Sequence, residues 1–292
     1  MQTTAETRTH PMRVFLEMIK FEHTIFALPF AYMGMVLAAG GWPGLATFLW
    51  ITLAMVSART LAMAVNRVAD RRYDAQNPRT AMRALPRGLL SPRFVWGVAL
   101  AAALLLFVSA AMLNWLVFAL APLAVLGLVG YSYTKRFTWL SHWVLGLVDG
   151  AAAAGGWAAV TATLAAPAFL LWAAVTFWIA GFDLIYACQD VAFDRQAGLH
   201  SFPARFGIAA SLTAARVCHV LTVALLGVTG VVLGLAWPYW VGLAVAAALL
   251  SYENSLVHPT DLSRLDIAFF NINGYISVIM FVAAWLGVAL RG

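Results

Sequence analysis

Charged side chains are scarce in this chain. Only 10% of its 292 residues are Asp, Glu, Lys or Arg, whereas 63% are hydrophobic, and the mean hydropathy is +0.85. A soluble globular domain carries about 25% charged residues, so the composition excludes that class. The apolar residues form long runs separated by short polar segments, without the roughly ten-residue alternation of outer-membrane strands. The sequence therefore predicts an all-α integral membrane protein, with residues 1–292 as one domain.

Cysteine is nearly absent as well. The two thiols, Cys188 and Cys218, have a spacing that suits neither a disulfide framework nor a zinc site. No small-residue cleavage site follows a short apolar core near the N-terminus, so we expect a retained first span rather than a cleaved signal peptide. The formal net charge of +6 does not indicate nucleic-acid binding, because the basic residues lie in loops between apolar runs.

A membrane-spanning helix needs about 20 apolar residues. Cutting the chain at its polar, Pro and Gly breaks predicts nine such helices, at residues 22–40, 45–65, 94–113, 115–134, 142–161, 167–187, 212–235, 238–256 and 267–290.

Alternate loops between nine spans fall on opposite sides of the membrane. Sixteen of the 18 Lys and Arg residues then share one side, with Arg291 alone on the other and Arg59 inside a span. By the positive-inside rule, this basic side is predicted to be cytoplasmic in a multi-pass protein of the cytoplasmic (inner) membrane. It comprises the N-terminus and the loops at residues 66–93, 135–141, 188–211 and 257–266.

Two acidic pairs end apolar runs on this side. Asp70 and Asp74 follow the second run, and Asp190 and Asp194 follow the sixth. On a continuing helix, a spacing of four places two carboxylates on one face, about 5–6 Å apart at their Cβ atoms, where they repel each other unless a cation lies between them. Asn66 lies one helical turn before Asp70 and is expected on the same helix face. Oxygen ligands of this kind suit Mg²⁺, which completes its shell with water and substrate phosphate oxygens.

Basic residues crowd the first acidic pair. Guanidinium groups beside metal-binding carboxylates indicate a diphosphate site. The alternative is that these side chains are solvated loop residues that obey the positive-inside rule. The arginines concerned are Arg71, Arg72, Arg79, Arg83 and Arg87.

These motifs resemble a known family. Asn66-x-x-x-Asp70-x-x-x-Asp74, followed by Asn77-Pro-Arg-Thr and Leu85-Pro-Arg-Gly, is similar to the first signature of the intramembrane aromatic prenyltransferases of quinone biosynthesis, the 4-hydroxybenzoate polyprenyltransferase family. The run from Asp183 to Arg195 resembles the second signature.

Two further segments carry the same resemblance, which covers nearly the whole chain in order. Tyr131-Ser-Tyr-Thr-Lys135-Arg136 resembles the family's tyrosine-lysine segment after the fourth span, and the run from Lys20 to Pro29 resembles the start of the first. The Asp-x-x-Asp-Gly-x-x-Ala-Arg signature of membrane CDP-alcohol phosphotransferases is absent.

The resemblance implies nine helices around a central cavity with a cytoplasmic-side cap, where two Mg²⁺ ions hold a polyprenyl diphosphate between the two Asp motifs. The implied metal ligands are Asn66, Asp70, Asp74, Asp190 and Asp194. The predicted catalytic residues are Asp183, Tyr131 and Lys135, and the predicted substrate-binding residues are Arg59, Arg72, Arg136, Lys20, Tyr186 and Asn271.

Arg59 and Asp183 lie inside predicted spans, where a charge at the helix centre costs roughly 2.5–3.5 kcal/mol. As functional groups, Arg59 holds the carboxylate or hydroxyl of an acceptor ring, and Asp183 orients Tyr186 or Lys135 or takes a proton. As structural groups, Arg59 and Asp183 form an intramembrane ion pair. His142 is expected to be an interfacial or packing residue.

The sequence departs from the family at Arg67, where many relatives have an acid. This residue either contacts diphosphate or points to water. Ala192 and Phe193 likewise replace accessory acids within the second motif, so which carboxylate carries which metal stays open.

The predicted function is Mg²⁺-dependent transfer of a polyprenyl group from polyprenyl diphosphate to a hydroxylated aromatic acid, with 4-hydroxybenzoate as the first choice. The active site is expected on the cytoplasmic side, and no nucleic-acid or obligate protein partner is implied. A dihydroxynaphthoate acceptor is the alternative within the family. Outside it, a cation-coupled transporter would place its acids near the bilayer midplane, with broken helices in inverted repeats.

Overall fold

The computed structural model of the chain describes residues 10–19, 27–265 and 272–291. Apart from turns, loops and one isolated bridge between His258 and Asp261, these residues are helical. The long helices are α2 (Leu28–Ala39), α3 (Leu45–Ala69), α5 (Pro92–Leu113), α6 (Trp115–Gly130), α7 (Ser141–Thr161), α8 (Ala166–Ala187), α11 (Ile208–Val232), α12 (Trp237–Ser255) and α13 (Asn273–Ala289). The short ones are α1 (Pro11–Met18), α4 (Arg71–Gln76), η2 (Tyr131–Arg136), η3 (Cys188–Asp190), α9 (Val191–Gln196) and α10 (Phe202–Phe206).

The length and composition of the helices confirm the membrane class. Among the described residues, six helical segments are long and apolar enough to cross a bilayer: Leu45–Ala69, Pro92–Leu113, Trp115–Arg136, Ser141–Thr161, Ala166–Gln196 and Ile208–Val232. Two further apolar helices, α2 and α13, are shorter. The predicted all-α membrane protein is therefore correct, while the count of nine crossings stays a prediction.

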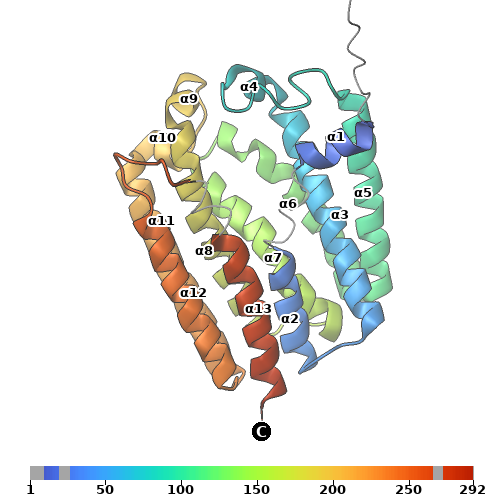
Figure 1. Cartoon of the computed structure of the whole chain (residues 1–292). Helices are drawn as coiled ribbons and strands as arrows, with labels where there is room; N and C mark the ends of the chain where they lie inside the picture. The colour runs from blue at the N-terminus through green and yellow to red at the C-terminus, as the bar shows by residue number, and fades with distance from the viewer. Residues whose placement is uncertain (1–9, 20–26, 266–271, 292) are drawn as a thin grey trace, which may run out of the picture.

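The bundle is organised around α7 and α8. These two helices pack against each other, with α2 and α13 following beyond α7, and α11 and α12 beyond α8 (Figure 1). A second group, in which α3 packs on α5 and α6 packs on both α5 and α7, completes the bundle. Trp178 of α8 is fully buried at the centre of the largest apolar cluster, in contact with Phe30 and Phe182 at ring-centroid distances of 4.7 and 5.1 Å.

Asn114 makes the turn between α5 and α6. Its side-chain oxygen accepts hydrogen bonds from the backbone amides of Leu116 and Val117, both at 3.1 Å, which caps the start of α6. Its amide group donates to the carbonyls of Ala158 and Ala159 at 2.8 and 3.1 Å. One polar residue thus satisfies backbone groups at two helix ends and ties the hairpin to α7.

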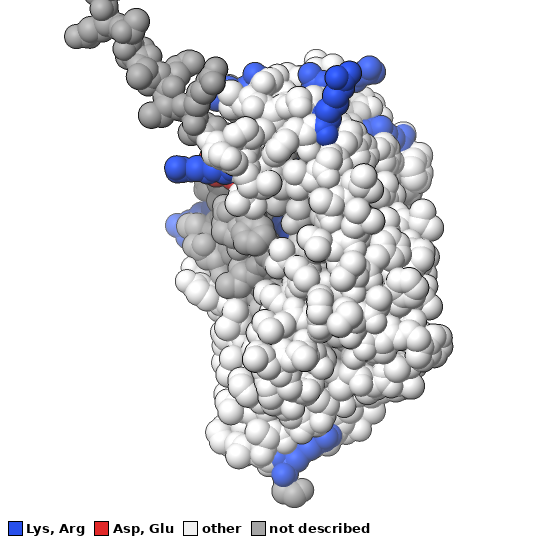
Figure 2. Space-filling view, turned by 90° about the vertical axis from the view of Figure 1, so that its right-hand side faces the viewer, with Lys and Arg blue, Asp and Glu red and all other residues white. Residues whose placement is uncertain are grey.

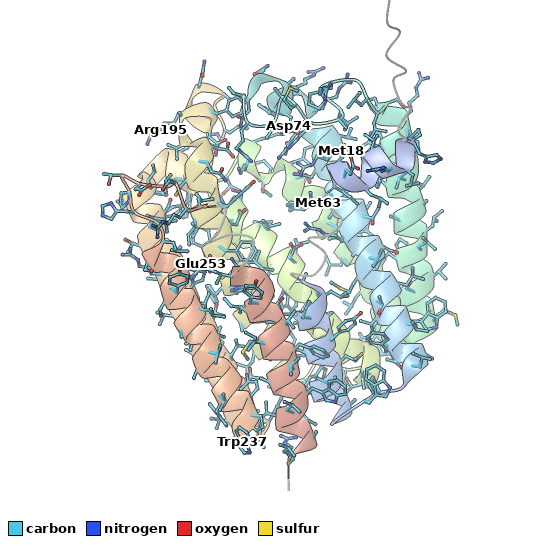
Figure 3. All side chains as sticks on the ribbon, in the orientation of Figure 1. Met18, Met63, Asp74, Arg195, Trp237 and Glu253 are labelled. Carbon is cyan, nitrogen blue, oxygen red and sulfur yellow. The ribbon has the colours of Figure 1, made fainter. Side chains whose placement is uncertain are left out.

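Both acidic motifs lie at the same end of the bundle. This end carries α4, α9 and α10, and we refer to it as the motif end (Figure 1). Figure 3 shows Asp74 and Arg195 there and Trp237 at the opposite end. On the face shown in Figure 2, basic side chains gather at the motif end, with few at the other end and a broad uncharged surface between. The structure therefore brings together two motifs that are more than 100 residues apart.

Candidate active site

A cavity of about 930 Å³ opens between the two motifs. Its walls come from α3, α4, η2, α7, α8, α9 and the loop after α4. Most of the predicted site residues line it, namely Arg59, Asn66, Asp70, Asp74, Tyr131, Lys135, Arg136, Asp183, Tyr186, Asp190 and Asp194. Arg72 is exposed and does not belong to this lining. Lys20 and Asn271 lie outside the described residues.

Neither acidic pair lies on a continuing helix, which differs from our expectation. The chain breaks at Asp70, between α3 and α4, with φ −90° and ψ 4°. It breaks in the same way at Asp190, between η3 and α9, with φ −98° and ψ 3°. Both aspartates occupy the sparsely populated bridge region between helix and strand conformations, where many active-site residues are found. The second carboxylate of each motif, on Asp74 and Asp194, is buried.

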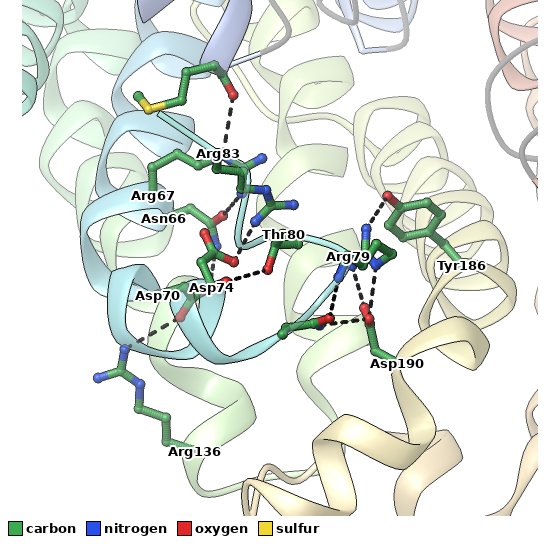
Figure 4. A network of polar contacts seen from close by, with 12 residues as sticks. Asn66, Arg67, Asp70, Asp74, Arg79, Thr80, Arg83, Arg136, Tyr186 and Asp190 are labelled. Carbon is green, nitrogen blue, oxygen red and sulfur yellow. Dashed lines mark hydrogen bonds and ion pairs between the residues drawn. The ribbon is translucent and has the colours of Figure 1, made fainter. Parts of the chain in front are cut away.

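The first aspartate, Asp70, lies between an amide and a guanidinium. The Asn66 side chain donates to Asp70 Oδ2 at 3.1 Å, and Arg136 lies 3.5 Å from Asp70 Oδ1 while donating to the carbonyl of Ala69 at 2.8 Å (Figure 4). Burial raises the pKa of Asp70 above its ordinary value, and the nearby Asp74 carboxylate raises it further. A cation at this position would relieve that unfavourable charge.

Arg67 is buried beside Asp70, with 8% of its surface exposed. It donates to the side-chain oxygen of Asn66 at 3.2 Å and to the carbonyl of Met18 at 3.4 Å. The alternative in which Arg67 points to water is therefore wrong. Arg67 fixes the orientation of Asn66 and ties α1 to the motif, and its guanidinium borders the cavity.

Asp74 is held by Arg83 through an ion pair of 2.7 Å. The hydroxyl of Thr80 donates to the Asp74 carbonyl at 3.1 Å, so the loop after α4 folds back over the motif. The other carboxylate oxygen, Asp74 Oδ2, is buried without a hydrogen-bond partner among the described residues.

Asp194 has the same feature in the second motif. Its Oδ2 is buried and lacks a hydrogen-bond partner in the described part of the chain, with Lys135 Nζ 3.9 Å away. A buried carboxylate oxygen without a donor is costly. Each motif thus has one such oxygen, and both residues line the same cavity.

Asp190 accepts hydrogen bonds from the loop that follows α4 in the first motif. Arg79 donates to both of its oxygens, from Nε at 3.0 Å and from a terminal nitrogen at 2.5 Å, and the amide of Asn77 donates at 3.1 Å (Figure 4). A third nitrogen of Arg79 donates to the Tyr186 hydroxyl at 2.9 Å. Arg79 was expected in a basic cluster beside the first motif, but this bidentate contact, which joins the two motifs directly, was not predicted.

Lys135 and Arg136 of η2 lie between the motifs. Lys135 faces Asp194, Arg136 faces Asp70, and the Arg136 guanidinium also stacks 4.7 Å above the Tyr133 ring. Adjacent cations that each face a different motif are well placed to neutralise an anion held between them.

Deeper in the cavity, Asp183 pairs with His142 and not with Arg59. His142 Nδ1 lies 2.6 Å from Asp183 Oδ2, so the structural alternative, an ion pair between Arg59 and Asp183, is wrong. Arg59 Nε is buried, and no described residue accepts a hydrogen bond from it. This role of His142 could not be predicted from the sequence, because its partner lies 41 residues away, on a different helix.

The oxygen ligands present fit Mg²⁺. No group of three Asp, Glu, His or Cys residues converges on one point within the described ranges. Mg²⁺ does not require such a cage, because it is commonly bound by one or two carboxylates and completes its shell with water and phosphate oxygens. The buried Oδ2 atoms of Asp74 and Asp194, which accept no hydrogen bond from any described residue, are suitable ligands for it.

We expect Arg79→Lys to weaken the connection between the motifs, because an ammonium cannot reproduce the planar two-nitrogen contact with Asp190. The KM for the polyprenyl diphosphate expected from the sequence should rise about tenfold, which corresponds to roughly 1.4 kcal/mol. The measurement is steady-state kinetics at saturating acceptor, with Arg93→Lys at the exposed start of α5 as the matched control. Equal KM values for the two variants would contradict the assigned role of Arg79.

Fold and site together define a helical membrane enzyme whose cavity, at one end of the bundle, combines paired carboxylates with arginines. Residues 27–287 match the UbiA prenyltransferase family, and the chain belongs to that family.

Curated relatives cover nearly the same length. The chain is 33% identical to a 4-hydroxybenzoate octaprenyltransferase of Xanthomonas campestris pv. campestris over 255 residues, which are 87% of this chain and 84% of the relative. It is 32% identical to the enzyme of the same name from Ralstonia nicotianae over 288 residues, 97% and 98% of the two chains.

Solved structures share the fold. The apo structure of a UbiA homolog from Aeropyrum pernix K1 matches with a TM-score of 0.83 and 35% identity, covering 90% of this chain and 97% of the other. A UbiA homolog from Archaeoglobus fulgidus, bound to DMAPP and Mg²⁺, matches with a TM-score of 0.73 over 95% and 99% of the chains. At 20% identity, this second match establishes the fold alone.

Proposed function

We propose that this prenyltransferase joins a polyprenyl group from polyprenyl diphosphate to a hydroxylated aromatic acid, with 4-hydroxybenzoate as the first candidate acceptor, in quinone biosynthesis. The observation that carries the proposal is that Asp74 and Asp194, from opposite motifs, line one cavity, and that each has a buried Oδ2 without a hydrogen-bond partner among the described residues. The names of the curated relatives support the choice of acceptor.

The proposed topology has nine crossings, with the N-terminus and the motif end in the cytoplasm. The gathering of basic side chains at the motif end supports this orientation (Figure 2). The short helices α4, α9 and α10 then form the cap over the cavity. A cation-coupled transporter is disfavoured because α4 and α9, at which the two acidic pairs lie, are at the same end of the bundle (Figure 1).

At the diphosphate end, Asp70 and Asp74 of one motif and Asp190 and Asp194 of the other would hold Mg²⁺. When bound, Mg²⁺ supplies electrostatic stabilisation of the charge that builds on the departing diphosphate. Lys135 and Arg136 add positive charge at fixed positions between the motifs, which costs no reorganisation during the reaction.

The deeper part of the cavity is proposed to hold the acceptor ring. Arg59, whose Nε has no hydrogen-bond partner in the described residues, would bind the acceptor carboxylate. Tyr131 and Asp183 line the same region. The allylic C–O bond breaks with its electron pair leaving on diphosphate, a ring carbon bonds to the prenyl carbon, and the displaced ring proton passes to the Asp183 carboxylate.

The test is prenyl transfer by the purified protein in lipid nanodiscs. A labelled polyprenyl diphosphate is supplied with a panel of benzoate and naphthoate acceptors, with Mg²⁺ or with EDTA. We expect a Mg²⁺-dependent prenylated product with 4-hydroxybenzoate, and EDTA should lower its rate at least about 100-fold, since a metal ion contributes several kcal/mol to stabilising the transition state. Product formed only from a dihydroxynaphthoate would reassign the acceptor, and absence of product from the whole panel would overturn the proposal.

A further inference from the structure

His142 lies in the first turn of α7 and contacts Asp183 of the neighbouring helix α8. It is fully buried and does not line the cavity. Its Nδ1 lies 2.6 Å from Asp183 Oδ2, and its Nε2 lies 3.3 Å from the backbone nitrogen of Phe202, at the start of α10. Both ring nitrogens are therefore engaged, by partners from two different elements.

These two contacts determine which nitrogen of the His142 ring carries the proton. A backbone N–H can only donate, so Nε2 must accept from Phe202 and carries no proton. The neutral ring then bears its single proton on Nδ1, where it donates to Asp183. An imidazolium would have a proton on both nitrogens and would oppose the Phe202 amide. His142 Nδ1 is thus the donor, and Asp183 Oδ2 the acceptor, of the hydrogen bond between them.

The surroundings of His142 hold it in place. Ser201 caps α10 by accepting a hydrogen bond from the Ala204 amide at 3.3 Å, which fixes the backbone at Phe202. The Phe202 ring packs on Trp143, the neighbour of His142 in α7, with 5.4 Å between ring centroids. The imidazole of His142 in α7 therefore connects α8, through Asp183, with α10, through the Phe202 backbone.

The contact with His142 matters for the orientation of Asp183 because the positively charged Lys135 is also near. Lys135 interacts electrostatically with Asp183 as well as with Asp194, and it lies toward the diphosphate end of the cavity. Attraction to this ammonium competes with His142 for the Asp183 carboxylate. The hydrogen bond from His142 occupies Oδ2, while Oδ1 has no hydrogen-bond partner among the described residues.

We propose that His142 is a positioning residue for prenyl transfer: it holds the Asp183 carboxylate so that one oxygen faces the acceptor ring. The inference rests on the proposed function, because it assigns Asp183 the role of accepting the proton displaced from that ring. His142 itself contacts no substrate and acts through Asp183.

The test is a double-mutant cycle with His142→Phe, Asp183→Asn and the double variant. We expect His142→Phe to lower kcat by about 10- to 100-fold, the usual cost of losing a residue that orients a functional group. The KM for polyprenyl diphosphate should stay the same, because the diphosphate end is untouched. In the Asp183→Asn background, His142→Phe should lower kcat less than about twofold, since the two residues act as one unit.

Two further variants separate positioning from a merely structural role. His142→Gln keeps a donor and an acceptor in the side chain, so it should recover most of the kcat that His142→Phe loses. His219→Phe replaces another buried histidine, in α11, that does not line the cavity, and kcat should stay at the wild-type value. Full additivity in the double variant, or equal kcat losses in His142→Phe and His219→Phe, would overturn the proposal.

A second readout does not depend on catalysis. In ¹⁵N-histidine-labelled protein, the NMR shifts of His142 should report a protonated Nδ1 and an unprotonated Nε2. A protonated Nε2 would overturn the positioning role even in a fully active enzyme. If the wild-type protein prenylates no aromatic acid, the proposed function fails and the proton acceptor role of Asp183 fails with it, whereas the NMR result still decides whether His142 donates to Asp183.

Discussion

Asp70→Asn should lower the rate of prenyl transfer by about 10²- to 10⁴-fold, which corresponds to the several kcal/mol that metal-assisted stabilisation of a leaving group contributes. The change removes one negative charge and leaves the shape of the side chain nearly intact. Asn66 and Arg136 both contact the Asp70 carboxylate, so an amide at this position also mismatches one hydrogen bond. The measurement is kcat at saturating prenyl diphosphate and acceptor.

A titration with Mg²⁺ identifies the cause of that loss. If Asp70 is a metal ligand, the concentration of Mg²⁺ that gives half-maximal rate should rise in Asp70→Asn. Asp261→Asn, at an exposed aspartate outside the cavity, is the matched control and should leave both values unchanged. Retention of more than about a tenth of the wild-type kcat by Asp70→Asn, a loss below 1.4 kcal/mol, would contradict the assignment of Asp70.

The sequence was sufficient to predict the membrane class and both motifs. Long apolar runs are sparsely charged for a direct physical reason, the cost of charge in hydrocarbon, and so they predict helices reliably. The positions of Asp70, Asp74, Asp190 and Asp194 could be predicted because each pair ends such a run. The helix breaks at Asp70 and Asp190 could not, since nothing in the local sequence forces the bridge conformation that each adopts.

Which basic residues serve the cavity was harder to predict. Arg72 and Arg79 lie in the same segment between two apolar runs and carry the same charge. In the structure, Arg72 is exposed on α4, whereas Arg79 donates to both carboxylate oxygens of Asp190. The difference arises because α4 ends at Gln76 and the following loop turns across the cavity. Charge patterns report the side of the membrane, but contacts between distant segments depend on the tertiary fold.

The close packing of α2 on α7 was likewise not predicted. Gly34 of α2 faces the backbone of Ala153 and Trp157, while Gly156 of α7 faces the backbone of Ala31 and Met35. A Cβ atom on Gly156 would lie 2.9 Å from the carbonyl carbon of Ala31 and 3.2 Å from the Met35 nitrogen. Small residues allow this approach, in which van der Waals packing replaces the hydrophobic effect as the force between membrane helices.

Gly156→Ala should therefore destabilise the protein strongly, while Gly155→Ala should not. The added methyl group at residue 156 meets backbone atoms, which cannot rotate away, so α2 must shift and the free energy of unfolding should fall by about 3 kcal/mol or more. A Cβ on Gly155 would meet no atom of the described structure within 4 Å. There the better helix propensity of Ala should raise stability by roughly 0.5–1 kcal/mol.

Equilibrium unfolding of the two variants in mixed micelles measures this difference directly, because the substitutions are chemically identical and one residue apart. Opposite signs for the two changes are the expected result. The destabilised variant should lose thermal stability without any selective change in the Mg²⁺ requirement, since Gly156 does not line the cavity. Equal unfolding free energies for Gly155→Ala and Gly156→Ala would show that α2 and α7 do not approach each other this closely in the membrane.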